Sequence, residues 1–229
     1  MGTFLNASNW VVLATGLSYY VTATPPNRRV NRSELLINTW VERFLLTRLM
    51  FLKIFVGSAC LMHILSTVFS MGICTTRTSS SSSESPTSLS TTMILGGGLA
   101  LLSASIRLWC YAEMRDLYDF EVDIKKAHRL VTSGPYAFVR HPGYIASCGA
   151  RIGVTMVMFS KDHWLYQCGL RSAVGVVLSC IWCAEVVVIN GVLIPARMKV
   201  EDDRLRRHFG GEWDDYASRV AYRLVPGIY

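Results

Sequence analysis

Charged residues are scarce in this chain. They make up 17% of its 229 residues, whereas hydrophobic residues make up 51%. A soluble domain carries closer to a quarter charged residues. Several apolar runs reach or approach the ~20 residues that a helix needs to cross a bilayer. The composition excludes an ordinary soluble domain. It predicts an all-α fold, a polytopic integral membrane bundle of about five transmembrane helices.

Recognisable nucleotide-binding signals are also lacking. The chain has no G-x-G-x-x-G motif and leaves no room for a Rossmann-type domain. Gly96, Gly97 and Gly98 follow no predicted strand, so they indicate close approach of helices rather than phosphate binding. The net charge of +7 is not accompanied by a nucleic-acid-binding motif. We therefore expect no nucleic-acid partner and attribute the excess of Lys and Arg to the cytoplasmic side of a membrane.

The cysteines do not form a recognisable framework. Seven are present, an odd number, and most lie inside apolar runs. This pattern predicts neither a disulfide scaffold nor a metal site. Cys180 and Cys183 form a C-x-x-C, but within a spanning helix the two residues share one face of one turn and are typical of packing.

The apolar runs organise the chain. The candidate spans are residues 10–23, 49–73, 93–113, 144–159 and 165–194. The first of these is short and weak, and the last two form a helical hairpin. We expect an N-terminal part, residues 1–113, that contains a low-complexity Ser-rich loop at residues 74–92. The C-terminal part, residues 114–229, would hold a motif loop, the hairpin and an amphipathic tail helix.

Basic residues segregate between the two sides that five spans would create. Of the 23 Lys and Arg residues, 17 lie in residues 25–48, in residues 114–143 and in the tail after Pro195. The Ser-rich loop and the hairpin turn hold only Arg77 and Lys161. The positive-inside rule therefore predicts that the first three segments face the cytosol.

Residues 130–144 combine turn signals with polar side chains at the start of an apolar run. Gly134 with Pro135, and Pro142 with Gly143, are two turn signals. Irregular backbone at membrane depth is tolerated only inside protein or around a ligand. We therefore expect this stretch to form one wall of a small-molecule site on the cytosolic side, and residues 197–209 to form the second wall.

Two groups of residues, one from each wall, have the spacing of a known family. The first is His128, Arg129, Leu130, Val131, Thr132, Ser133, Gly134 and Tyr136, followed by Arg140, His141, Pro142, Gly143 and Tyr144. The second is Arg197, Glu201, Asp202, Leu205, His208, Phe209, Gly210, Trp213 and Tyr216. Together they resemble the motifs of the isoprenylcysteine carboxyl methyltransferases, although Asp202 stands where that family usually has a second Glu.

The resemblance implies an S-adenosylmethionine-dependent enzyme of the endoplasmic reticulum membrane, multi-pass, with its active site facing the cytosol. The substrate would be a prenylated protein whose C-terminal farnesyl or geranylgeranyl cysteine carboxylate is methyl-esterified. Arg197 would be the catalytic, substrate-binding residue. The residues implied in cofactor binding are His128, Arg129, Leu130, Val131, Tyr136, His141, Pro142, Gly143, Tyr144 and Glu201.

Residue chemistry is compatible with this reaction. A carboxylate acceptor is already ionised at neutral pH and needs no general base, so the enzyme must chiefly position and desolvate its reactants. Arg197 can hold a carboxylate bidentately. Glu201 could accept hydrogen bonds from ribose hydroxyls or from an amine. Arg140 is expected to be structural, paired with an acid or a helix C-terminus.

Three alternatives remain open at this point. A phospholipid N-methyltransferase acting on phosphatidylethanolamine-type lipids would need a base for its amine and would gain nothing from Arg197. A catalytically silent membrane scaffold would not bind S-adenosylmethionine. The sterol-reductase group has C-termini similar to residues 222–226, but this chain is short for it.

Two charged residues fall inside the predicted hairpin. Arg151 and Glu185 are functional suspects because ions within a membrane are costly. If the hairpin turns at Asp162, they differ in depth by about 18 Å, which predicts no direct pairing. Glu185 could line the lipid entry, and His63 is expected to be a packing residue.

Overall fold

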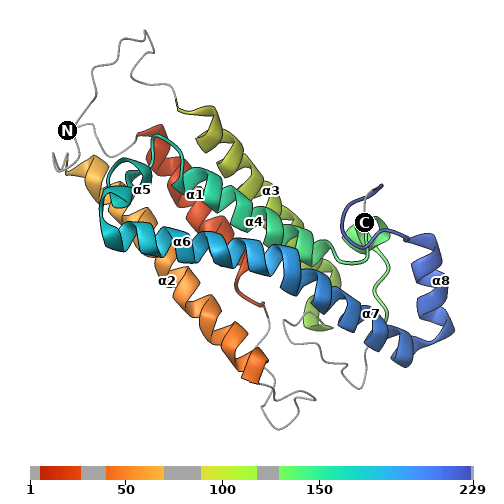
Figure 1. Cartoon of the computed structure of the whole chain (residues 1–229). Helices are drawn as coiled ribbons and strands as arrows, with labels where there is room; N and C mark the ends of the chain where they lie inside the picture. The colour runs from red at the N-terminus through yellow and green to blue at the C-terminus, as the bar shows by residue number, and fades with distance from the viewer. Residues whose placement is uncertain (1–5, 27–39, 70–88, 118–128, 228–229) are drawn as a thin grey trace.

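The computed structural model describes residues 6–26, 40–69, 89–117 and 129–227, and the described residues contain helices and no strands (Figure 1). In chain order the α-helices are α1 (Ala7–Thr22), α2 (Trp40–Val68), α3 (Thr91–Met114), α4 (Pro142–Met158), α5 (Trp164–Gln167), α6 (Ala173–Val188), α7 (Ile194–Phe209) and α8 (Gly211–Arg219). The 3₁₀ turns are η2 (Arg115–Leu117), η3 (Gly134–Ala137) and η4 (Gly169–Arg171), and η5 (Ile189–Leu193) is a π-helical turn.

Helices long and apolar enough to cross a membrane confirm a helical membrane protein. In the described part of the chain three qualify: Thr47–Val68 within α2, α3, and the continuous run Ala173–Phe209. The helices α1 and α4 have 16 and 17 residues and fall short of that length. The expected number of five spans therefore stays a prediction.

Small residues bring α3 and α4 into close contact, as the glycine run predicts. A Cβ atom on Gly96 would lie 2.8 Å from the carbonyl oxygen of Gly153, and one on Gly153 would lie 2.6 Å from that of Gly96. Gly97 faces α1, where a Cβ atom would lie 2.7 Å from Val11. Gly98 has nothing within 4 Å. Two of the three glycines thus permit close helix packing.

Trp182 joins α6 to the rest of the bundle. Its side chain is 1% exposed and contacts the rings of Tyr19 on α1 and Phe55 on α2, with centroids 5.8 and 5.7 Å away. Its indole N–H donates to Thr155 Oγ1 on α4 at 2.9 Å. A buried indole that finds an acceptor in this way adds apolar contact without an unsatisfied donor.

The chain between α4 and α6 is not the tight turn that the sequence suggested. Phe159 to Ser172 includes both α5 and η4, so α6 begins only at Ala173. Glu185 is consequently closer in depth to Arg151 than a simple hairpin implies. Arg151 Nε lies 3.9 Å from Glu185 Oε1, and the prediction that these residues do not pair is wrong. Cys168, in this connection, is disulfide-bonded, which the cysteine pattern did not predict.

The helix that begins at α6 does not end at Pro195. It passes through the π turn η5 into α7 and ends at Gly210, whose φ is 55°. Pro195 has no N–H to donate to the preceding turn, and the wider π turn lies directly before it, where the α-helical pattern loses that donor. Figure 1 shows the resulting rod reaching past the bundle to α8. It thereby carries Arg197 and Glu201 to the end of the molecule where the motif loop lies.

Candidate functional site

The motif loop, the part of residues 130–144 that precedes α4, is fixed to the end of α3. Gly134 has a φ of 60°, and a Cβ atom there would lie 2.8 Å from Glu113 Oε2. The Ser133 hydroxyl donates to Glu113 Oε1, and the Tyr136 hydroxyl lies 2.8 Å from the sulfur of Met114. A backbone with positive φ favours glycine, and a side chain here would also collide with Glu113, so this position requires Gly134.

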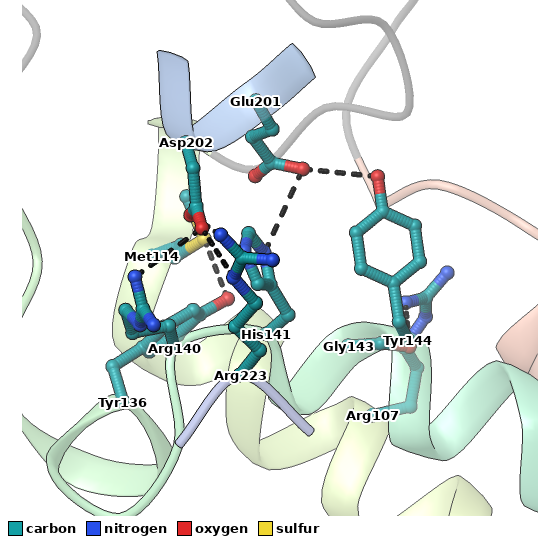
Figure 2. A network of polar contacts seen from close by, with 10 residues as sticks. All are labelled: Arg107, Met114, Tyr136, Arg140, His141, Gly143, Tyr144, Glu201, Asp202 and Arg223. Carbon is teal, nitrogen blue, oxygen red and sulfur yellow. Dashed lines mark hydrogen bonds and ion pairs between the residues drawn. The ribbon is translucent and has the colours of Figure 1, made fainter. Parts of the chain in front are cut away.

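Asp202 is the centre of a charged cluster that joins α7 to the motif loop (Figure 2). Its side chain is 7% exposed. Its Oδ1 lies 2.8 Å from His141 Nε2, and its Oδ2 lies 3.2 Å from Arg140 Nη1 and 3.1 Å from Arg223 Nε. The expectation that Arg140 is structural and pairs with an acid is confirmed.

The C-terminal segment closes the same cluster from outside. The backbone N–H of Arg140 donates to the carbonyl of Tyr222 at 3.0 Å, and that of His141 donates to the carbonyl of Arg223 at 2.9 Å. Arg140 Nη2 also donates to the carbonyl of Ala221. Since His141 immediately precedes α4, these bonds hold the first turn of α4 in place.

Tyr144 and Glu201 face each other beside this cluster (Figure 2). The Tyr144 hydroxyl donates to Glu201 Oε2 at 2.9 Å, and His141 Nδ1 lies 3.8 Å from the same oxygen. The Arg197 side chain also interacts with Tyr144. The Glu201 side chain remains 32% exposed, in contrast to the buried Asp202. Glu201 is therefore the acid of this pair that a ligand can reach.

Helix α8 covers the motif loop. Trp213, Tyr216 and Val220 are buried and pack against Leu130 of the loop and Leu205 of α7. The Tyr216 hydroxyl donates to the carbonyl of Tyr136 at 2.9 Å, and burial raises the pKa of this phenol above its usual value. The sequence did not predict α8 as a separate helix.

The structure thus brings most of the predicted site residues to one end of the bundle. His141, Tyr144, Arg197 and Glu201 meet there, with Pro142 buried at the start of α4. Leu130 and Tyr136 serve the contacts just described, and Arg129 and Val131 are exposed and half-buried. His128 lies outside the described residues.

Arg107 is a further residue that the sequence reading missed. It lies in α3, is 5% exposed, and donates from Nη1 to the carbonyl of Gly143 at 2.7 Å and from Nη2 to that of Thr22 at 3.0 Å. It thereby joins α1, α3 and the first turn of α4. A single arginine within an apolar run was a signal that could have found it.

This donor and acceptor set fits the polar groups of S-adenosylmethionine. A partly exposed carboxylate suits its amine or its ribose hydroxyls, and the tyrosine and histidine rings of residues 144 and 141 provide flat apolar surface with polar edges. Among the residues that the structure describes, no group of three or more His, Cys, Asp or Glu side chains could hold a metal ion.

The fold and this polar cluster define a helical membrane protein with a candidate small-molecule site at one end of its bundle. Residues 96–178 match the model of the isoprenylcysteine carboxyl methyltransferase (ICMT) family, the family that the motifs resemble. Methyl transfer is the activity that the description of this family names.

Two curated proteins match parts of the chain. A nickel-cobalt-cadmium resistance protein, NccN, of Alcaligenes xylosoxydans xylosoxydans is 30% identical over 134 residues, which are 58% of this chain and 49% of that protein. A 7-dehydrocholesterol reductase of Arabidopsis thaliana is 42% identical over 43 residues, 19% of this chain and 10% of that protein. The chain therefore spans about half of the first relative and a tenth of the second. No solved structure matches.

Proposed function

We propose that the chain methyl-esterifies the C-terminal prenylcysteine carboxylate of processed proteins, using S-adenosylmethionine, at the cytosolic face of the endoplasmic reticulum membrane. The observation that carries this proposal is the meeting of Arg197, Glu201 and Tyr144 at the end of a bundle whose residues 96–178 match the ICMT family model. A cation and a partly exposed acid that both contact Tyr144 suit an anionic acceptor and a cationic methyl donor.

Each side chain has a separate role in this proposal. When bound, S-adenosylmethionine supplies an electrophilic methyl group. Glu201 would hold its polar groups, and the hydrogen bond from Tyr144 orients that carboxylate. Arg197 would orient the acceptor carboxylate, which is ionised at neutral pH and needs no base. His141 and Asp202 would hold the first turn of α4 in register with α7.

Arg197 provides the direct test. Arg197→Ala should lower kcat/KM for N-acetyl-farnesylcysteine, because a partly desolvated carboxylate loses its partner. The loss of transition-state stabilisation should be about 2–4 kcal/mol. Arg197→Lys should recover part of the rate, since a point charge cannot reproduce the bidentate geometry. The measurement is radiolabelled methyl transfer, with calorimetric binding of S-adenosylmethionine as the control. A near wild-type rate for Arg197→Ala would remove the carboxylate contact from the proposal.

N-methylation of a phospholipid amine is the second candidate. The His141 ring, with Asp202 at Nε2, has the arrangement of a base that could take a proton from an amine. Parallel assays with N-acetyl-farnesylcysteine and phosphatidylethanolamine separate the two functions. Methylation of the lipid without methylation of the prenylcysteine would replace the first proposal with the second.

The orientation in the membrane is tested separately. We expect a cysteine introduced at Lys161 and one introduced at Asp215 to be labelled from opposite sides, because the first lies at the α5 end and the second in the tail. The disulfide of Cys168 near Lys161 favours an oxidising compartment at that end. Labelling of both positions from one side would contradict this orientation.

A further inference from the structure

Three ionisable side chains meet inside the membrane part of the chain, away from the Asp202 cluster. Arg48 of α2 lies with Nη1 at 2.5 Å from Glu185 Oε1 of α6. Arg151 of α4 approaches the same oxygen with Nε at 3.9 Å and donates from Nη1 to Asn190 Oδ1 at 3.3 Å. Their side chains are between 9% and 15% exposed. We call Arg48, Arg151 and Glu185 the intramembrane cluster.

The charges of this cluster do not balance. Among the side chains that the structure describes, two guanidinium groups surround one carboxylate, which leaves one positive charge in excess. An uncompensated charge is costly in a bilayer, and such residues mark binding or transport functions. The excess therefore calls for an anion.

Several polar atoms of the cluster are buried without a hydrogen-bond partner. They are the Nε atoms of Arg48 and Arg151 and the Oε2 atom of Glu185. The hydroxyl of Tyr19, which is 3% exposed and interacts electrostatically with all three residues, also lacks a partner. An unmade hydrogen bond at a buried polar group costs free energy that a ligand would recover on binding. Two N–H donors and one hydroxyl together suit an oxyanion.

The cluster adjoins the candidate site along α4. Arg151 Nη1 donates to the carbonyl of Ser147 at 2.9 Å, and the Ser147 hydroxyl donates to the carbonyl of Gly143 at 3.2 Å. Since residues 143 and 147 are one helical turn apart, the Arg151 guanidinium lies about 6 Å along α4 from the turn that carries Tyr144. Arg197 interacts with Tyr144 itself.

The exposed side chains near the intramembrane cluster are apolar, and this limits the kind of ligand that can approach it. Met50 and Phe51 of α2 are 60% and 67% exposed, and Val187 and Val188 of α6 are 70% and 47% exposed. These apolar side chains flank Arg48 and Glu185 in sequence and suit the hydrocarbon of a bilayer. An anion that arrives through the bilayer must therefore carry an apolar tail.

We propose that Arg151, together with Arg48 and Tyr19, forms an oxyanion site for the carboxylate of the prenylcysteine acceptor. This site would be a second cationic contact, deeper in the membrane part of the chain than Arg197. This inference rests on the proposed function. In it Glu185 holds the two guanidinium groups in place and Asn190, in the π turn η5, orients Arg151. Single π turns inside α-helices are frequent at functional sites.

The test compares an acceptor with its uncharged analogue. The full chain in lipid nanodiscs, saturated with S-adenosylhomocysteine so that no turnover occurs, is titrated with N-acetyl-farnesylcysteine and with the corresponding carboxamide. The wild type should bind the carboxylate about 10- to 100-fold more tightly, the range of one charge-assisted hydrogen bond. Arg151→Gln should lose the share of this preference that Arg197 does not supply, and Arg151→Lys should lose less.

Two properties make these variants interpretable. Arg151→Gln leaves Arg48 and Glu185 as a balanced pair, so we expect it to fold and to bind S-adenosylhomocysteine like the wild type. Arg171→Gln removes an arginine from η4, at the far end of α6, and should keep the full preference for the carboxylate. The readout is a ratio for two ligands, which a general loss of folded protein would not change.

The oxyanion site and the proposed function are contradicted by different results. If the wild type methylates prenylcysteine and Arg151→Gln keeps the preference, the oxyanion site is wrong and the proposed function stands. If Arg151→Gln instead loses a co-purified phospholipid while keeping the preference, the site binds a lipid phosphate and our assignment is wrong. Loss of S-adenosylhomocysteine binding in Arg151→Gln would also overturn it. Failure of the wild type to methylate prenylcysteine would contradict the proposed function itself.

Discussion

Asp202 Oδ1 lies 2.8 Å from His141 Nε2, so one carboxylate connects helix α7 to the residue that precedes α4. The two residues are far apart in sequence, and each has further partners: Asp202 has two arginines, and the backbone N–H of His141 donates to the C-terminal segment. The relative position of the two walls of the site therefore depends on this carboxylate.

Asp202→Asn should destabilise the protein strongly. It would leave Arg140 and Arg223 beside a neutral amide, and removing one partner of a buried ion pair costs about 3–5 kcal/mol. Asp203→Asn, at the neighbouring exposed position, is the matched control and should change little. Thermal unfolding in detergent would measure both. Equal unfolding midpoints for the two variants would contradict a structural role for Asp202.

Glu201→Gln should instead impair cofactor binding and leave folding unchanged. Its side chain is 32% exposed, so little buried charge is disturbed. The loss of one charge-assisted hydrogen bond corresponds to about 10- to 100-fold in affinity. Calorimetric titration with S-adenosylmethionine would measure it, with Asp203→Asn again as the control. Unchanged affinity would remove Glu201 from the cofactor site.

Two glycines of α3 should respond in opposite ways to alanine. Gly96→Ala places a Cβ atom against the backbone of Gly153 and should cost about 1–3 kcal/mol through overpacking. Gly98→Ala meets nothing within 4 Å and should stabilise α3 by up to about 1 kcal/mol through helix propensity. The comparison of their unfolding midpoints isolates helix contact from propensity, and the same shift in both would argue against the close approach of α3 and α4.

His163 should make stability fall in mild acid. Burial lowers the pKa of this residue from 6.5 to about 3, with a smaller contribution from His63. In the unfolded chain His163 therefore binds a proton below about pH 6.5, whereas in the folded chain it binds one only below about pH 3. At pH 5.5 this one group should cost about 1.4 kcal/mol relative to neutral pH.

His163→Asn provides the control for that titration. The amide can still accept the Leu165 N–H, as His163 Nδ1 does at 3.1 Å, but it does not titrate. Unfolding midpoints measured between pH 7.5 and pH 5.5 should therefore decline less steeply in the variant. A variant with the wild-type decline would show that other groups carry the pH dependence.

Hydropathy predicted the helical class, and motif spacing predicted the family whose model matches residues 96–178. These features depend on local composition and on residues close in sequence. The glycine contacts of α3 were predictable for the same reason, since small residues in an apolar run permit few other roles. The roles of the individual cofactor residues stay predictions.

Other features depend on tertiary contacts that no local pattern contains. The shorter side chain of Asp202 made its role uncertain in the sequence, yet its three partners come from two distant segments. The pairing of Arg151 with Glu185 was missed because α5 and η4 take up chain length that a simple turn would not. Arg48, which completes that cluster, lies on a different helix altogether.

The unbroken helix from Ala173 to Phe209 connects the membrane part of the chain to the candidate site. One end of this rod lies among lipids and the other carries Arg197 and Glu201. A helix that is long for its membrane accommodates a thinner bilayer by tilting. Tilt at the lipid end would strain the contacts of Asp202 and Glu201 with the start of α4, which α3 and the C-terminal segment also hold. Under the proposed function, we expect membrane thickness to change the alignment of Arg197 and Glu201, so that turnover depends on lipid composition.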